Sequence, residues 1–153
     1  MVTSLSDSPS VGPGRRLMVG LGFAGLAPFY GFAALACLQD LSMQQLARQG
    51  FTLYALAILS FLAGSLWGSA NVRVGPEKTS RLLISNAVTV IGVAVLIVLS
   101  PMLAAALLAL LHLFLLYYEI AHSTAGWYLR LRRQLTWCSM PAYGVFLASQ
   151  LLM

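Results

Sequence analysis

His112 and Glu119 are the two ionisable side chains whose positions could support chemistry in this chain. They are seven residues apart in a long apolar run, a spacing that places both on one face of a helix. At a rise of about 1.5 Å per residue, His112 lies midway through a bilayer and Glu119 lies at its cytoplasmic edge. An ionisable group at mid-membrane depth is a candidate for a proton, ion or ligand site.

A purely structural interpretation of the same two residues stays open. A neutral His112 could bond a hydroxyl on a neighbouring helix, or a carbonyl that Pro28 leaves free. Glu119 could reach cytoplasmic water or pair with Arg130. The two interpretations differ in whether a polar cavity reaches His112.

The composition predicts that these residues are positioned by membrane-spanning helices. Of 153 residues, 59% are hydrophobic and 8% are charged, against about 25% charged in an average soluble domain. Five apolar runs are each near the ~17–25 residues needed to cross a bilayer, and spans of this kind must be helical because lipid offers no hydrogen-bond partner to the backbone. The runs are Leu17–Leu38, Gly50–Ala70, Leu82–Ser100, Met102–Tyr118 and Leu135–Met153. We therefore predict an all-α bundle of five transmembrane helices.

The basic residues predict the orientation of this bundle. Threading five spans puts every Lys and Arg except Arg48 on the same side of the membrane. The positive-inside rule then places the N-terminus in the cytoplasm and the C-terminus outside. Residues 1–14, rich in Ser, Gly and Pro, are predicted to be a disordered cytoplasmic tail, and residues 15–153 a single transmembrane domain. The absence of an Arg-rich segment before Arg15 favours a bacterial inner membrane, with a mitochondrial inner membrane as the alternative.

Two spans carry residues that are unusual for their position. Pro28 lies in the middle of the first span and predicts a helix kink, because proline cannot donate a backbone hydrogen bond. Ala57, Ser60, Gly64 and Gly68 form a stripe of small side chains along the second span. Small residues at this spacing let two membrane helices approach closely, so the stripe predicts helix packing.

Polar and aromatic residues gather at the cytoplasmic boundary, where all three tryptophans fall. An interfacial belt normally marks both faces of a membrane, so this asymmetry suggests a cytoplasm-facing pocket. The candidate ion or ligand residues there are His112, Glu119, Trp67, Asn86, Tyr118 and Trp127. The alternative is an amphipathic turn in which Arg130, Arg132 and Arg133 lie on anionic lipid headgroups.

Three segments resemble one family of small membrane proteins. They are Gly22–Phe29, Tyr54–Gly68 and Trp127–Thr136. Their order and spacing resemble the domain of unknown function 3429, a family that also includes the animal transmembrane protein 69. The resemblance implies a multi-span membrane protein and no particular activity. This chain departs from the family pattern at Ala63, where a second glycine is expected, and at His122, where the loop often has an acidic residue.

The sequence predicts a protein that is not an enzyme. It has no Ser/His/Asp set, no paired carboxylates, no phosphate-binding loop and no metal-ligand spacing, so we expect no cofactor. Its net charge of +5 comes from basic residues that lie where membrane insertion requires them, so this charge does not indicate nucleic-acid binding. We expect an accessory or scaffold protein that packs against a membrane-protein partner, a second copy or lipid. The alternative is a small oligomeric transporter or binding protein for a proton, ion, quinone or lipid that uses His112.

Overall fold

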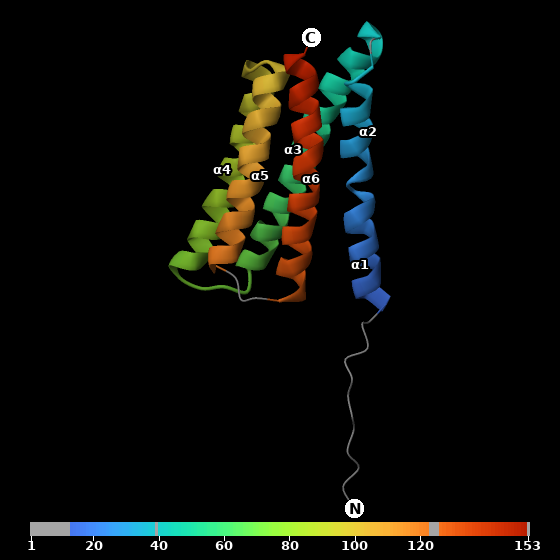
Figure 1. Ribbon diagram of the computed structural model, residues 1–153. Helices are drawn as coiled ribbons and strands as arrows, with labels where there is room; N and C mark the ends of the chain where they lie inside the picture. The colour runs from blue at the N-terminus through green and yellow to red at the C-terminus, as the bar shows by residue number, and fades with distance from the viewer. Residues whose placement is uncertain (1–12, 39, 123–125, 153) are drawn as a thin grey trace, which may run out of the picture.

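The computed structural model describes residues 13–38, 40–122 and 126–152, and every regular element among them is an α-helix (Figure 1). The all-α prediction is therefore confirmed for these residues. The predicted tail lies outside the described residues except for Pro13 and Gly14, which begin the first helix. The helices are α1 (Pro13–Ala24), α2 (Ala27–Leu35), α3 (Leu41–Ala70), α4 (Pro76–Val98), α5 (Pro101–His122) and α6 (Trp127–Leu151).

Four helical segments are long and apolar enough to cross a membrane, so the chain is a multi-pass membrane protein. They are Gly14–Leu35, which joins α1 and α2, and the helices α3, α4 and α5. The fifth predicted span corresponds to α6, which has 25 residues and packs against α2 and α5. Its arginines and its Ser and Gln residues lower its hydropathy below that of the other four.

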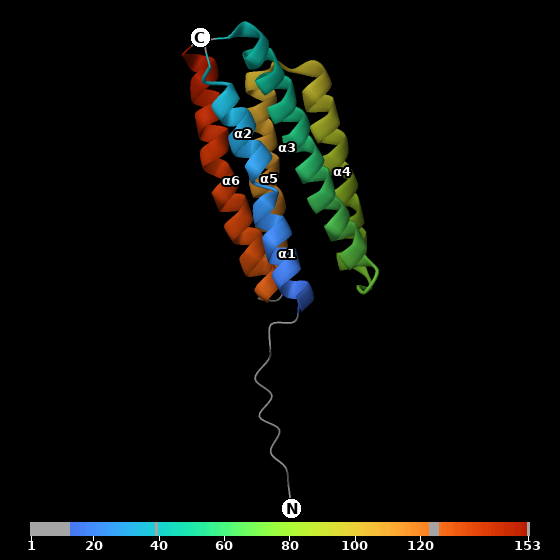
Figure 2. The ribbon, with the colours of Figure 1, turned by 90° about the vertical axis from the view of Figure 1, so that its right-hand side faces the viewer.

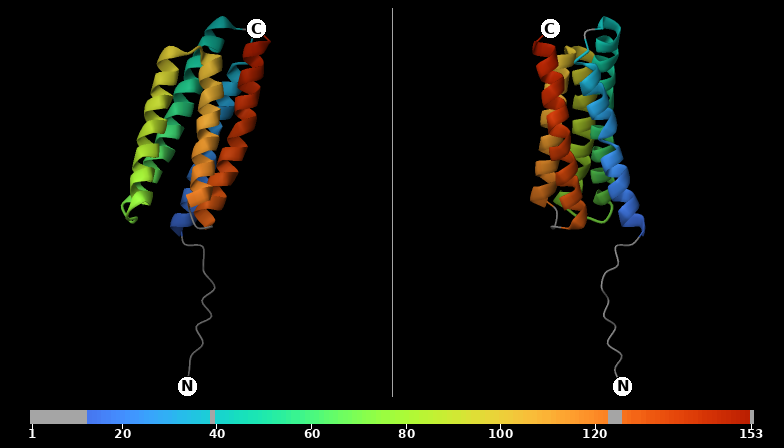
Figure 3. Two further views of the ribbon diagram at one scale, coloured as in Figure 1. Left: turned by 90° about the vertical axis from the view of Figure 1, so that its left-hand side faces the viewer. Right: turned by 45° about the vertical axis from the view of Figure 1, so that its right-hand side comes forward.

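Helices α1 and α2 run in the same direction, and from α2 to α6 each helix reverses the direction of the one before it, as Figures 1 and 2 show. The starts of α1, α4 and α6 and the ends of α3 and α5 lie at one end of the bundle. The α2–α3 and α4–α5 connections and the end of α6 lie at the other end (Figure 3). The alternation therefore places eight of the nine Lys and Arg residues at or near the first end, which we call the basic end, and Arg48 toward the opposite end.

The first span is interrupted just before Pro28. Helix α1 ends at Ala24, and α2 begins at Ala27, with Pro28 in its first turn, where a missing N–H costs little. The Tyr54 hydroxyl of α3 donates to the Gly25 carbonyl at 2.7 Å. A side chain of the neighbouring helix thus supplies a hydrogen bond to the interrupted turn.

Helix α3 packs against α2, α4 and α5. The buried face of α3 includes Phe51, Ala55, Leu59 and Ala63, all fully buried. Phe51 stacks on Phe146 of α6, with ring centroids 4.2 Å apart. This packing anchors α3 to α6 toward the end of the bundle that lies opposite the basic end.

Candidate functional site

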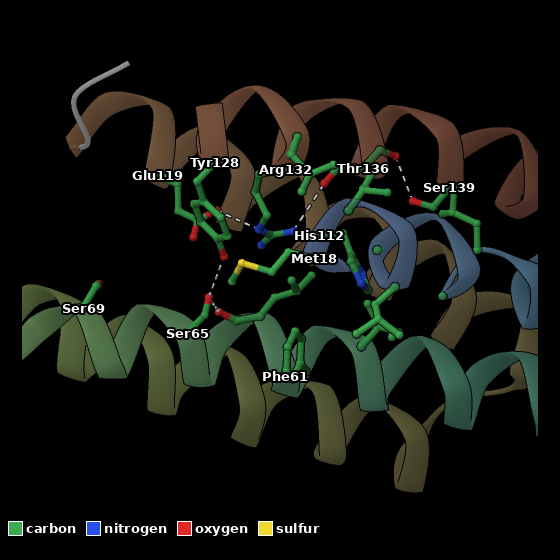
Figure 4. Close-up of a pocket in the computed structure, with 18 of the residues that line it drawn as sticks. Met18, Phe61, Ser65, Ser69, His112, Glu119, Tyr128, Arg132, Thr136 and Ser139 are labelled. Atoms are coloured by element: carbon green, nitrogen blue, oxygen red, sulfur yellow. Dashed lines mark hydrogen bonds and ion pairs between the residues drawn. The ribbon is translucent and has the colours of Figure 1, made fainter. Parts of the chain in front are cut away.

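A cavity of about 660 Å³ lies within the basic half of the bundle (Figure 4). This volume is within the ~300–1,000 Å³ typical of small-molecule sites. Residues from all six helices line it. Most of the wall is apolar and includes Leu21, Leu26, Phe29, Ile58, Leu62 and Leu135. The polar part of the wall comes mainly from one face of α6 and from α5.

His112 reaches this cavity from α5 with only 2% of its surface exposed. Its Nδ1 lies 2.9 Å from the Leu108 carbonyl one turn earlier and 3.3 Å from the Tyr143 hydroxyl of α6. A carbonyl can only accept, so Nδ1 carries the proton that is donated to Leu108. In a neutral ring, Nε2 then keeps its lone pair, and no residue that the structure describes bonds it. His112 therefore presents a buried acceptor without a partner.

Arg132 and Glu119 form an ion pair across the same cavity. Arg132 Nε lies 3.0 Å from Glu119 Oε2, and both side chains are more than nine-tenths buried. The contact is close but is not aligned as a hydrogen bond. Arg132 Nη1 is 3.5 Å from the Thr136 hydroxyl, and Nη2 has no hydrogen-bond partner in the described part of the chain. The pair neutralises charge but leaves donors of a buried guanidinium unsatisfied.

A second basic group lies at the outer end of the cavity, where Arg81 is 2% exposed. Its guanidinium donates to Glu77 at 3.1 Å, to the Ser69 hydroxyl at 2.9 Å and to the His122 carbonyl at 2.7 Å. Arg73 also pairs with Glu77, at 3.4 Å. These bonds join α3, α4 and the end of α5, so Arg81 is held in place by the protein itself.

Two of the six predicted ligand residues line the cavity, and the other four do not. His112 and Glu119 line it. Trp67 and Asn86 are exposed, and the Asn86 amide donates to the Leu82 carbonyl of its own helix at 2.8 Å. Tyr118 is buried and bonds Ser80 at 2.7 Å.

Trp127, the remaining predicted ligand residue, also lies outside the cavity. The Arg15 guanidinium lies 5.2 Å from the centre of its ring. This cation–π contact links the start of α1 to the start of α6. Trp127 therefore contacts α1 at the basic end and does not line the cavity.

The structure corrects two predictions about arginines. Arg130 and Arg133 are exposed on α6, where they could contact lipid headgroups as predicted. Arg132 is only 3% exposed and points into the bundle. The three residues lie on different faces because successive helical positions are 100° apart. The partner of Glu119 is accordingly Arg132 rather than Arg130.

The structure also distinguishes the two partners that the sequence left open for His112. It bonds the hydroxyl of Tyr143 and the carbonyl of its own helix, while the interrupted turn near Pro28 receives its bond from Tyr54. His112 therefore contacts a hydroxyl of a neighbouring helix, as one of the two interpretations expected, and it does not bond a carbonyl of the first span.

The small-residue stripe faces away from the bundle. Gly64 and Gly68 are exposed, and a Cβ at either would meet no atom within 4 Å. Ala57 is exposed and Ser60 is half-buried on the same side of α3. Within the described chain, α3 therefore packs through its alanine-rich face, and the predicted packing stripe stays open to a neighbour outside it.

Sequence reasoning missed several residues of the site. They are Tyr128, Arg132, Thr136 and Ser139 on α6, Tyr143 beyond them, and Ser65 and Ser69 on α3. A signal was present, because the α6 set recurs at intervals of four, four and three residues, which is the spacing of one helix face. A polar stripe within a buried helix indicates a lined cavity or a polar contact.

The described residues contain no group of three or more His, Cys, Asp or Glu side chains able to hold a metal ion. The polar groups of the cavity are instead hydrogen-bond donors and acceptors beside an apolar wall. Such a surface suits an amphipathic organic molecule.

Comparison with known proteins gives one match. A family model described as "Protein of unknown function (DUF3429)" matches residues 14–148, which include all the residues that line the cavity. Searches of curated proteins and of solved structures returned no match.

Proposed function

The chain belongs to the DUF3429 family of proteins of unknown function, and we propose that it is a five-span membrane protein that binds an amphipathic small molecule inside its helix bundle. It binds without catalysing a reaction. The observation that carries this proposal is the cavity of about 660 Å³ in which His112 Nε2 and Arg132 Nη2 are buried without partners. Buried polar groups are normally satisfied, so two unsatisfied groups in one cavity support a binding site there.

Length and charge support α6 as the fifth span. Its 25 residues extend about 37 Å at 1.5 Å per residue, enough to cross ~30 Å of hydrocarbon. Of its three arginines, Arg132 is paired inside the bundle, and the exposed Arg130 and Arg133 lie in its first two turns, at the basic end. Five spans put the basic end in the cytoplasm and the end of α6 outside. We place the protein in a bacterial inner membrane, with a mitochondrial inner membrane as the alternative.

Purification in a mild detergent followed by native mass spectrometry tests the binding function. We expect the wild-type protein to retain an amphipathic small molecule. The variant Ser65→Phe places a ring in the cavity and should lose it. The control Asn86→Phe makes the same kind of change on the exposed side of α4 and should keep it. Equal retention by the two variants would count against an intramembrane site.

A second candidate function follows from the stripe Ala57, Ser60, Gly64 and Gly68. Because no atom of the described chain covers Gly64 or Gly68, this face is open to a helix of a partner protein or of a second copy. We propose it as the contact through which the protein acts as an accessory subunit. Gly64→Leu and Gly68→Leu should abolish cross-linking to that helix, whereas Val90→Leu, on the exposed side of α4, should not. Unchanged cross-linking in the glycine variants would remove this candidate.

A further inference from the structure

We propose that the polar end of the bound molecule is a single protic oxygen group, a hydroxyl or an un-ionised carboxyl, attached to one apolar chain or ring system. This inference rests on the proposed binding function and specifies its ligand class. It follows from the hydrogen-bond capacity that the two unsatisfied groups of the cavity leave open.

His112 requires a donor. Its Nδ1–H is directed to the Leu108 carbonyl, so in the neutral ring Nε2 can only accept. The ring is 2% exposed, and Phe29 packs against it edge-on with ring centroids 6.4 Å apart. No donor within the described chain reaches Nε2. A ligand that satisfies His112 must therefore bring an O–H or N–H group.

Arg132 requires an acceptor. All guanidinium nitrogens donate, and Nη2 has no hydrogen-bond partner in the described residues. Arg132 and His112 line one cavity, and Figure 4 shows the Arg132 side chain on the His112 side of Glu119. A hydroxyl or carboxyl group donates one proton and accepts through its lone pairs. One such group therefore carries both the donor that His112 lacks and the acceptor that Arg132 lacks.

The charge of the groups beside His112 disfavours other head groups there. Beside His112, Glu119 already neutralises Arg132, so a phosphate dianion held there would add negative charge to a neutral pair, and the other two arginines of the lining, Arg73 and Arg81, are already paired with Glu77. A quaternary ammonium would find no second carboxylate among the residues that line this cavity. A ketone, ester or quinone carbonyl brings no proton and would leave Nε2 unsatisfied. The protic oxygen group is the class that adds no charge and fills both bonds.

The remaining walls determine the rest of the ligand. The side chains of Leu26, Ile58 and Leu62 offer only apolar contacts. Burying alkyl groups against them contributes about 0.8 kcal/mol per CH₂. The volume of about 660 Å³ suits one chain or ring system rather than a whole two-chain lipid.

Three probes that share one C16 chain test this inference: hexadecan-1-ol, hexadecanoic acid and methyl hexadecanoate. Affinities are measured on the full-length protein in nanodiscs by competition against a labelled C16 alcohol. We expect the alcohol or the acid to bind about tenfold more tightly than the ester, because the ester leaves a buried acceptor unpaired. The preference between alcohol and acid identifies which protic group the site takes.

Two histidine variants provide the matched comparison. His112→Phe removes the acceptor, so the preference over the ester should fall below about twofold. His122→Phe changes the other histidine, which is exposed and bonds the Tyr118 carbonyl at 3.0 Å, and the tenfold preference should remain. If His112→Phe does not fold, His112→Gln keeps an acceptor oxygen and should retain part of the preference.

The outcomes separate this inference from the function on which it rests. An ester that binds wild-type protein as tightly as the alcohol and the acid overturns the protic head group and leaves binding intact. A preference that survives in His112→Phe overturns the role of His112. If no probe binds the wild type more tightly than Ser65→Phe, the proposed binding function itself fails.

Discussion

At the scale of single residues, the Arg132–Glu119 pair joins α5 to α6 inside the bundle. Burying two opposite charges contributes little net stability, because the cost of removing both from water offsets their attraction. Removing one partner is different, since the other charge then remains buried alone. The pair therefore constrains the packing of α5 and α6 more strongly than its net energy suggests.

Replacing Arg132 with Leu should lower the free energy of unfolding by about 3–5 kcal/mol, because Glu119 would remain buried without its partner. Reversible unfolding in mixed detergent micelles measures the change. Arg133→Leu removes the same charge from the exposed neighbouring position and should change stability by less than about 0.5 kcal/mol.

The double variant Arg132→Leu/Glu119→Leu tests the reason for this effect. It removes both charges and should be more stable than Arg132→Leu alone. A double variant less stable than the single variant would show that the carboxylate is not the source of the loss.

At the scale of elements, helix α3 begins nine residues before the predicted span, at Leu41 rather than Gly50. Asp40 caps this start by accepting the backbone N–H groups of Ser42 at 2.8 Å and Met43 at 3.2 Å, and the Ser42 hydroxyl also donates to it. The hydrogen bond from the Ser42 hydroxyl, followed by those from the two backbone groups, lowers the pKa of the Asp40 carboxyl.

This lowered pKa predicts how the cap depends on pH. A carboxyl whose pKa is lower in the folded state stabilises folding above its unfolded pKa, and the contribution is lost as pH falls through the folded value. Asp40→Asn keeps an acceptor that does not titrate. The difference in thermal stability between wild type and Asp40→Asn should therefore favour wild type at neutral pH and move toward the variant in acid. A difference that is constant with pH would contradict the role of the ionised cap.

Replacing either of two glycines of α3 with alanine should change the stability of the fold in opposite directions. A Cβ at Gly50 would lie 2.3 Å from the Phe32 ring of α2, whereas a Cβ at Gly64 meets nothing. Gly50→Ala should destabilise the fold by about 1–3 kcal/mol through overpacking. Gly64→Ala should gain up to about 1 kcal/mol from helix propensity. Unfolding in detergent distinguishes them, and equal effects would contradict the close α2–α3 contact.

Hydropathy predicts which segments of the chain are helical because lipid demands length and apolar composition of every span. It misplaces the start of α3 because the cap at Asp40 precedes a polar turn that hydropathy does not detect. It also misplaces Arg132, since three arginines within four positions resemble a solvated turn. Only the position of Glu119 on α5 shows which arginine points inward, and that is tertiary information. His112 was predictable as a candidate because an ionisable residue at its depth is rare.

At the scale of the whole molecule, the alternation of helices separates charge between the two ends of the bundle. The connection between α3 and α4 lies at the basic end, and the connection between α2 and α3 lies at the opposite end. If the protein crosses the membrane five times, these two connections are on opposite sides of the bilayer.

Cysteine labelling tests this separation. With Cys37 and Cys138 replaced by Ser, Lys78→Cys should react with an impermeant thiol reagent only after the cells are permeabilised. Gln45→Cys should react in intact cells. Both positions are exposed in the structure, so a difference reports the side of the membrane and not burial. Labelling of Lys78→Cys in intact cells would reverse the orientation.

The interruption at Gly25 and Leu26 divides the first span into two parts that are held differently. Tyr54 of α3 bonds the Gly25 carbonyl within the interruption, and Tyr30 of α2 bonds the Cys138 carbonyl of α6 at 2.6 Å, so the interruption and α2 are each tied to a neighbouring helix. Helix α1 has no buried residue among those described, yet Met18, Leu21 and Gly22 cover the cavity. Outward swing of α1 alone would open a sideways portal from the bilayer interior to His112. A ligand could then enter from the lipid phase without crossing water, while α2 stays in place.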